Sequence, residues 1–598
     1  MTSPHTEQLP FRRSDASSGS SDPLKRIKDA LGHHPTAVSC ALAYMKASKI
    51  SPDAYLARLQ PEIAAEQARC GDLHAATYAV LSVSYKAIPS GAQKLLLLLS
   101  CFSSNDFPLQ LVRHAANDHF DYEMYEAVRR EKQEITVAVS RLKEIFYVEG
   151  NFDDGELRRN RHSLKQYNFI FETPSGELDL VSMRPEVKFW AQSRMDQRAK
   201  ATYQAAAIQL LGRSPKDQDS MDKYLAPQIM EFKATFGTLH TNDKASFASV
   251  LYRTGEYEQS LPLFKQVAND LERKCGRAHQ ETVLALTWLA TVEQANKDYE
   301  AAVTHRKIVV NETRRIFEPG DPRVAAVEAS LAESYASLGQ YELARRLYEK
   351  VLELRKILLG NNDPDTLATS AELAGVYQSL GLLDEALKLR RDVYIRRNNA
   401  FGKDDPNTIL AANNLGVTYY DAAMSRKRAL HSGEEVEGGE GVVRDFLVEA
   451  RELQVQVLRY RRTSTLGNMS PDTQAAMKNL MWTYYELNQT TDAEQEAKTL
   501  CGASTKSRGP NDSFTLRARL ALALFQKNLT SATKIQEAIK EGHPDYEYAT
   551  NIVRAIEASQ EKPREPEKVS CFKSFLRMIC EFFSVVFSHS HMCAGCCL

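Results

Sequence analysis

A short motif recurs every 42 residues through the second half of this chain, and this period constrains the fold more than any other feature. Each copy opens with a polar residue, usually followed by proline, and has threonine or valine in its fourth position. The copies begin at His279, Asp321, Asp363, Asp405, Ser470 and Asp512, and only the interval from Asp405 to Ser470 is longer, by 23 residues. A fixed period of this size indicates stacked supersecondary units that bury their apolar sides against one another.

The residues that follow each motif predict an amphipathic helix. Seven positions after the fourth motif residue stands a leucine in every copy: Leu289, Leu331, Leu373, Leu415, Leu480 and Leu522. The next position is small in all copies but one: Ala290, Ala332, Ala374, Gly416, Met481 and Ala523. Eleven positions after the motif, four copies have tyrosine: Tyr335, Tyr377, Tyr419 and Tyr484. These spacings keep one helical face, and the small residue lets a second helix approach closely.

A turn and a second helix complete the unit. Gly255, Gly339 and Gly381 recur just before a large residue such as Tyr257 or Tyr341, and glycine suits the left-handed residue that ends a helix. Further periodic glycines mark the end of the second helix: Gly276, Gly360, Gly402, Gly467 and Gly509. Aspartate and proline then cap the next unit. We count about seven units over residues 240–545, with degenerate first and last copies.

This pattern resembles the tetratricopeptide repeat, in the 42-residue form found in kinesin light chains and in many multidomain NTPase receptors. The resemblance implies a mainly α chain that forms a right-handed solenoid of helical hairpins. The 23-residue insertion contains an acidic, glycine-rich run at 432–441, which predicts a flexible loop at about 425–447.

Residues before the repeats have another character. Residues 1–22 are polar and rich in serine, which predicts disorder, and 23–75 predict a helical segment. Within 76–235, the alternating runs Phe169 to Glu172 and Leu178 to Val181 flank a turn at Pro174 to Gly176, which predicts a β-hairpin. Helices followed by one hairpin suggest a winged-helix module.

That order resembles the helical and winged-helix part of NB-ARC signalling ATPases, including fungal relatives of plant resistance proteins. In that family a Leu-Gly-x-x-Pro-x-Ala segment lines the adenine pocket and a Ser-Tyr-x-x-Leu-Pro segment starts the winged helix. The matching residues are Leu31, Gly32, Pro35 and Ala37 for the first segment and Ser84, Tyr85 and Pro89 for the second. The family's nucleotide-sensing Met-His is replaced here by Met183-Arg184-Pro185.

The sequence predicts neither an enzyme nor a cofactor. It contains no Gly-x-x-x-x-Gly-Lys-Ser/Thr phosphate loop and no recognisable catalytic constellation, so we expect neither ATP binding nor hydrolysis. The 76 basic and 77 acidic residues nearly balance, and 134–145 has mixed charge, which disfavours nucleic-acid binding.

A row of candidate partner-binding residues comes from the kinesin-light-chain resemblance. In those repeats an asparagine on the first helix faces the groove and binds the ligand backbone, and an amide suits this because it both donates and accepts. Asn414 and Asn479 match that position, which holds Trp288, Ser330 and Glu372 in earlier units. The alternative is that these are ordinary exposed helix residues.

The C-terminal residues form a second unusual feature. A charged linker at 559–570 precedes an amphipathic, cysteine-rich tail at 571–598. Its cysteines are candidate lipidation sites: Cys571, Cys580, Cys593, Cys596 and Cys597. A lipid-anchored interfacial helix, a packing helix, and a metal site of His589, His591, Cys593 and Cys596 are the three interpretations. The cysteine pattern elsewhere indicates a reducing compartment, so we expect the cytoplasm, with membrane contact through the tail.

Together these features predict a non-enzymatic interaction scaffold in signalling or regulation, which binds a protein or peptide in the repeat groove. One alternative is a truncated or vestigial NB-ARC receptor ATPase whose core lies upstream. Another is a cargo adaptor like a kinesin light chain, although no N-terminal heptad pattern supports it.

Overall fold

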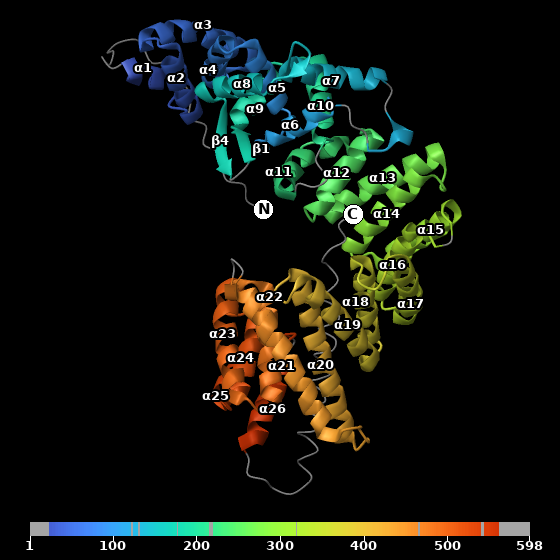
Figure 1. Ribbon diagram of the computed structural model, residues 1–598. Helices are drawn as coiled ribbons and strands as arrows, with labels where there is room; N and C mark the ends of the chain where they lie inside the picture. The colour runs from blue at the N-terminus through green and yellow to red at the C-terminus, as the bar shows by residue number, and fades with distance from the viewer. Residues whose placement is uncertain are drawn as a thin grey trace. The chain divides into compact units, whose positions relative to one another are not determined.

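The computed structural model describes residues 23–120, 124–129, 132–175, 178–213, 219–318, 320–463, 467–539 and 543–560, and this part of the chain is mainly helical (Figure 1). The chain divides into two compact units between Asp298 and Tyr299. The predicted disorder at 1–22 and the tail at 571–598 lie outside the described residues.

Short helices and strands precede the repeats. They are α1 (Pro23–Ala30), α2 (Pro35–Ser48), α3 (Pro52–Cys70), α4 (Asp72–Ala87), α5 (Ser90–Leu99), β1 (Phe107–Pro108), α6 (Gln110–Asn117), η1 (Glu126–Val128), α7 (Lys132–Phe146), β2 (Tyr147–Val148), β3 (Asn151–Phe152), α8 (Asp154–Gln166), β4 (Ile170–Ser175), β5 (Leu178–Met183), α9 (Pro185–Ser193), α10 (Gln197–Leu211), α11 (Asp219–Met230) and η2 (Lys233–Thr238). Trp190 lies at the core of this region, stacked on Phe169 and edge-on to Tyr85 at ring distances of 6.1 and 5.4 Å.

The predicted β-hairpin is confirmed. Strands β4 and β5 pair antiparallel, with Ile170 opposite Met183 and Ser175 opposite Leu178. Strand β1 pairs with the other edge of β5, which gives a three-stranded sheet in the order β1-β5-β4. Strands β2 and β3 form a separate two-stranded sheet.

Paired helices make up the rest of the described chain, as the 42-residue period predicted. The first helices of the pairs are α12 (Thr241–Arg253), α14 (Gln280–Ala295), α16 (Pro322–Ser337), α18 (Pro364–Ser379), α20 (Pro406–Ser432), α22 (Pro471–Glu486) and α24 (Ser513–Phe525). The second helices are α13 (Tyr257–Cys275), α15 (Tyr299–Ile316), α17 (Tyr341–Leu358), α19 (Leu383–Phe401), α21 (Gly439–Arg462), α23 (Thr490–Arg508) and α25 (Leu529–Ala538), and η3 (Gly467–Met469) and α26 (Tyr546–Gln560) complete the order.

The ends of these helices follow the local chemistry of the motif. The Asp363 carboxylate accepts hydrogen bonds from the backbone N–H groups of Asp365 and Thr366, at 2.9 and 3.4 Å, and Asp512 caps α24 in the same way. Such caps satisfy donors that the first turn leaves unpaired. The turn between paired helices needs a left-handed residue, which is Gly381 after α18, with φ of 78°.

The repeated leucines and small residues form the core of each pair. Leu331, Leu373 and Leu415 are buried, and Ala332 and Ala374 have no exposed surface. At the corresponding position of α20, a Cβ atom on Gly416 would lie 3.3 Å from the Cβ of Leu453 on α21. The two helices therefore approach too closely for a larger residue without some displacement.

The sequence analysis predicted a loop at about 425–447, and these bounds are wrong because the connection is much shorter. Helix α20 continues to Ser432 and α21 begins at Gly439, so only residues 433–438 connect them. Ala423 and Met424 on α20 pack against Val443 and Leu447 on α21, and this apolar contact extends both helices beyond the length of their neighbours. The glycines that suggested a loop at 439 and 441 lie in the first turn of α21.

We predict that Gly416→Val destabilises the protein by about 1–3 kcal/mol, because the added side chain overpacks the contact with Leu453. Gly502→Val is the matched control: Gly502 lies in α23, a Cβ atom added there would meet no other atom within 4 Å, and valine has the better helix propensity. Urea unfolding monitored by circular dichroism measures both variants. Equal midpoints for the two variants would contradict the packing argument.

Candidate functional site

Four of the predicted partner-binding residues occupy one register on successive first helices of residues 299–560. Ser330 lies on α16, Glu372 on α18, Asn414 on α20 and Asn479 on α22. Glu372 is exposed, and the other three are partly exposed. We call the surface that these four residues share the first-helix face.

Hydrogen bonds and ion pairs link neighbouring first helices along this face. The side-chain amide of Gln378 on α18 donates to the carboxylate of Asp421 on α20. Lys427 on α20 forms an ion pair with Glu486 on α22. Asp421 and Glu486 each lie seven residues after an asparagine of the face, which is two helical turns. The face is therefore continuous from α18 to α22.

Arginines from the second helices support the face from behind. Arg390 on α19 donates through Nη1 to the backbone oxygen of Asn414, at 2.7 Å, and to the hydroxyl of Thr418. Its Nη2 lies on the side of Gly375 on α18, where an added Cβ atom would come within 3.9 Å of it. Arg390 thus connects α19 to α20 at the site.

This support repeats at a fixed distance along the sequence. Arg306 on α15 donates to the backbone oxygen of Ser330 and to the carboxylate of Glu333, the latter at 3.1 Å. Both arginines precede their face residue by 24 positions. The sequence analysis did not identify these two arginines. Their spacing was a possible signal, since positions 306 and 390 are two 42-residue periods apart on the second helices.

Burial, modified by neighbouring charges, shifts the pKa of three groups at the face. The protein surrounding the Glu372 carboxyl group, together with the nearby Glu333 carboxylate, raises the pKa of Glu372 to about 7, and Arg390 opposes this rise. Burial raises the pKa of Asp421 to about 6, against the stabilising effects of Gln378, Arg390 and Arg428. Burial lowers the pKa of Arg390 to about 10. Within the described residues Glu372 forms no hydrogen bond or ion pair, and Glu333 and Arg390 are the charged groups that act on its carboxyl group.

The two asparagines keep hydrogen-bonding capacity. The Asn414 side-chain oxygen accepts from the Asn413 amide at 3.3 Å. The side-chain oxygen of Asn479 is buried and has no hydrogen-bond partner among the described residues. This oxygen keeps its acceptor capacity, but it is buried and does not reach a ligand in this conformation.

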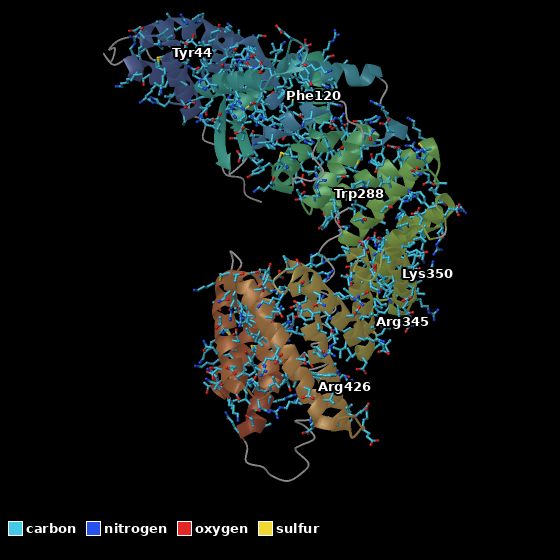
Figure 2. The ribbon with its side chains drawn as sticks, viewed as in Figure 1. Tyr44, Phe120, Trp288, Arg345, Lys350 and Arg426 are labelled. Carbon is cyan, nitrogen blue, oxygen red and sulfur yellow. The ribbon has the colours of Figure 1, made fainter. Side chains whose placement is uncertain are left out.

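Trp288, the fifth predicted partner-binding residue, packs against other aromatic side chains. It lies on α14, in the unit that ends at Asp298 (Figure 2). Its ring stacks on Phe264 at 5.7 Å and meets Tyr252 edge-on at 5.9 Å. Phe264 also precedes Trp288 by 24 positions, the same separation as the supporting arginines.

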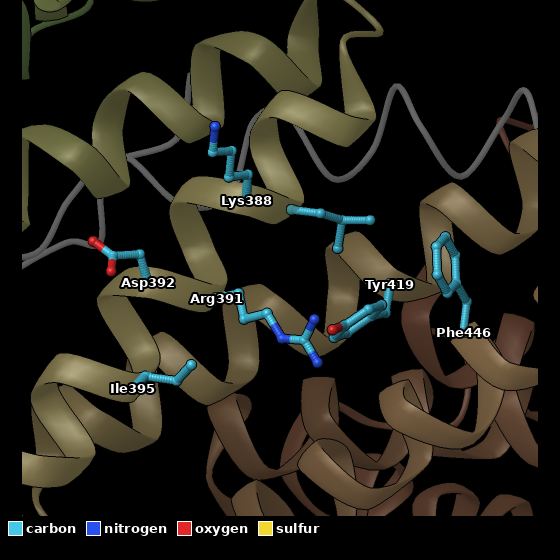
Figure 3. Close-up of a pocket in the computed structure, with 7 residues that line it drawn as sticks. Lys388, Arg391, Asp392, Ile395, Tyr419 and Phe446 are labelled. Atoms are coloured by element: carbon cyan, nitrogen blue, oxygen red, sulfur yellow. The ribbon is translucent and has the colours of Figure 1, made fainter.

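A pocket that the sequence did not predict opens between α19, α20 and α21 (Figure 3). It has a volume of about 470 Å³, and Arg391, Ile395, Tyr419 and Phe446 contribute to its lining. The ring of Phe446 packs edge-on against Tyr419 at 5.5 Å, under the guanidinium of Arg426. The pocket depends on the position of α21, whose length the sequence analysis did not foresee.

The residues that resemble the NB-ARC segments are partly in the core and partly at the surface, where Gly32, Pro35 and Pro89 are exposed. Leu31 and Ala37 are buried, and Pro35 opens α2. Tyr85 packs on Trp190, and Pro89 precedes α5. The guanidinium of Arg184, which stands where the family has histidine, lies 4.8 Å from the centre of the Phe171 ring.

The candidate lipidation cysteines at 571, 580, 593, 596 and 597 lie outside the described residues. Within the described ranges, no helix is both long enough and apolar enough to cross a membrane. The same part of the chain contains no cluster of three or more histidine, cysteine or acidic residues with the geometry of a metal site.

We predict that Glu372→Gln changes the pH dependence of stability. The folded-state pKa of Glu372, about 7, lies above the ordinary value of 4.5, so the folded protein binds this proton more tightly than the unfolded chain does. The wild type therefore loses stability as the pH rises from 4.5 towards about 7, and the variant lacks this loss. Urea unfolding at several pH values should show the stability difference growing in favour of the variant over this range and then levelling.

Glu333→Gln tests the cause of the shift. Removing the like charge lowers the pKa of Glu372, so the pH-dependent loss moves to lower pH. Parallel pH profiles for the wild type and Glu372→Gln would contradict the assignment of this titration to Glu372.

Comparison with known proteins supports the fold. Family models described as tetratricopeptide repeat match residues 245–281, 281–357 and 365–430. No curated protein matches the sequence. Among solved structures, a protein described as a kinesin light chain with nearly identical TPR-like repeats, from Podosopora anserina, is 23% identical, with a TM-score of 0.32, and the match covers 38% of this chain and 98% of that one.

Two further structures are similar over longer stretches. A signal transduction ATPase with a tetratricopeptide repeat sensor, from Pyrococcus horikoshii, is 12% identical, with a TM-score of 0.38, covering 91% of this chain and 74% of that one. The quorum sensor NprR of B. thuringiensis is 13% identical, with a TM-score of 0.39, covering 62% and 92%. These low values carry no functional argument. The family models and the observed helix pairs together identify the chain as a protein that contains tetratricopeptide repeats.

Proposed function

We propose that this chain is a non-enzymatic scaffold in signalling or regulation, which binds protein or peptide partners on the first-helix face. The observation that carries the proposal is the unpartnered Glu372 carboxyl group in register with Asn414 and Asn479. Most buried polar groups are satisfied within the fold, whereas the Glu372 carboxyl group has no hydrogen-bond or ion-pair partner among the described residues.

The chemistry of the face suits an extended peptide. The amides of Asn414 and Asn479 are able to bind the peptide backbone, which makes recognition independent of sequence at those points. Glu372 favours a cationic group of the ligand, because a positive charge there lowers the pKa of its carboxyl group. Tetratricopeptide repeats present long surfaces of this kind to partners.

A second candidate is a vestigial NB-ARC receptor. The observation that favours it is the order of helices and strands in the N-terminal part, where α5, β1, α6 and α8 precede the β4–β5 hairpin and β1 adds to the same sheet. We interpret this arrangement as a winged-helix module that has lost its nucleotide-binding role, since the sequence lacks a phosphate loop.

We also propose a cytoplasmic location with membrane contact through residues 571–598. This part of the proposal rests on the apolar stripe and the cysteines of the sequence alone.

The partner-binding proposal predicts selective loss of partners from face variants. Affinity purification of the full chain from source cells, with quantitative mass spectrometry, compares the wild type with Glu372→Lys and with the double variant Asn414→Ala/Asn479→Ala. We expect at least one set of proteins to fall about ten-fold in both variants, since interface residues of this kind contribute about 1–2 kcal/mol each.

Asn399→Ala is the matched control, because Asn399 is an exposed asparagine on the second helix α19. It should retain the same set of proteins. Thermal unfolding of each variant excludes misfolding as the cause. Identical sets in all variants, or an equal loss in the control, would reject the first-helix face as the binding surface.

We predict that the chain does not bind ATP. A fluorescent ATP analogue with Mg²⁺ should show no saturable change in anisotropy, because no backbone cradle or lysine for the phosphates is encoded. Saturable binding that unlabelled ATP displaces would instead favour a working nucleotide site in the N-terminal module.

A further inference from the structure

The segment of residues 124–129, between α6 and α7, contacts the start of the repeats through its backbone. The Asn242 side chain on α12 accepts a hydrogen bond from the N–H of Tyr125 at 2.6 Å and donates to the backbone oxygen of the same residue at 3.1 Å. It also lies 3.5 Å from the backbone oxygen of Val128. A single amide thus binds both polar groups of one residue, a mode that does not depend on that residue's side chain.

A carboxylate binds the next two backbone amides. The two oxygens of Glu281, in the first turn of α14, accept from the N–H groups of Glu126 and Ala127, each at 2.9 Å. These N–H groups begin the short helix η1, where a negative charge is favourable. Charge-assisted hydrogen bonds of this type are stronger than neutral ones.

Two apolar side chains of the segment are buried as well. Tyr125 has no exposed surface, and Val128 is 4% exposed. Asn242, which holds the segment, is 2% exposed. The segment therefore has the features of a bound peptide: two side-chain anchors, four backbone hydrogen bonds within 3.1 Å, and receptor groups that include a buried amide.

The segment does not belong to the regular structure on either side of it. The backbone oxygen of Phe120 accepts from Gln209 on α10 at 2.8 Å, which fixes the chain after α6. Within 124–129 the secondary structure is limited to the single turn η1. Residues 124–129 bind at the starts of α12 and α14, which belong to the repeats (Figure 1). The segment therefore joins the N-terminal module to the repeats.

We propose that the surface formed by the starts of α12 and α14 is a second peptide-binding site, which the chain's own residues 124–129 occupy as a tethered ligand. A partner that carries a Tyr-x-x-Val segment binds there by displacing residues 124–129. The site is distinct from the first-helix face, because Asn242 and Glu281 lie in the unit that ends at Asp298.

The contacts define what the partner must supply. It needs a tyrosine-sized ring for the buried position of Tyr125 and a valine three residues later. Proline is excluded at the tyrosine position and at the two that follow, because each of these residues donates a backbone N–H. The covalent tether gives residues 124–129 a high effective concentration, so a partner binds weakly until the segment is released.

A labelled peptide tests the proposal on the full chain. The probe is a fluorescein-labelled peptide with the sequence of residues 121–131, and its anisotropy is measured with the wild type and with Tyr125→Ser/Val128→Ser. The double variant holds its own segment poorly, so we expect it to bind the probe at least ten-fold more tightly than the wild type. Adding Asn242→Ala to the double variant should remove this gain, and a probe with alanine at the Tyr125 position should bind neither protein.

If residues 124–129 are a permanent part of the fold and cannot be displaced, the peptide experiment has other outcomes. Equal affinity for the wild type and the folded double variant, or no binding to either, would overturn the proposal. Hydrogen exchange of the wild type provides a test that needs no variant. An excess of unlabelled peptide should speed the exchange of the amides at 125–127 at least ten-fold, whereas exchange that the peptide leaves unchanged would also overturn the proposal.

Discussion

The close approach of two helices within each pair is the constraint on which the repeat region depends. Ala332 and Ala374 have no exposed surface, and Gly416 leaves its Cα against Leu453 on the partner helix. In these pairs a small residue lets the second helix cover the leucine one position earlier, and α22, which has Met481 there, also buries both residues. A single hairpin cannot bury this apolar side alone, so each pair needs the next, and the register of every exposed residue is set by this stacking.

The same packing determines the chemistry of the first-helix face. Arg390 connects α19 to α20 and also lies close enough to influence the carboxyl groups of Glu372 and Asp421. Its own pKa falls to about 10, which shows that burial of the guanidinium is not fully compensated by its neighbours. A ligand that adds a charge to this face alters the electrostatic environment of a residue that also holds the helices together.

The sequence was sufficient for features that repeat or are local. The 42-residue period predicted the helix pairs, and alternation about Pro174 predicted the β4–β5 hairpin. The long α20–α21 pair was missed because Gly439 and Gly441 indicated a loop, while the packing of Met424 against α21 decided the outcome. The roles of Arg306 and Arg390 required knowing which second-helix position faces the next first helix. The binding of Tyr125 by Asn242 joins residues 117 positions apart, and no local pattern encodes it.

The long α20–α21 pair indicates where this solenoid tolerates inserted residues. Helix α20 has 27 residues and α18 has 16, a difference of about three full turns at 3.6 residues per turn. Asn479 keeps the register of Asn414 despite the longer interval, because each follows the residue that opens its own motif, Ser470 or Asp405, by nine positions. The connection at 433–438, with exposed Glu434, Glu435 and Glu437, forms the acidic tip of a pair in which α20 is about 16 Å longer than α18. Insertions at this tip lengthen the end of one hairpin and leave the register of the neighbouring first helices unchanged.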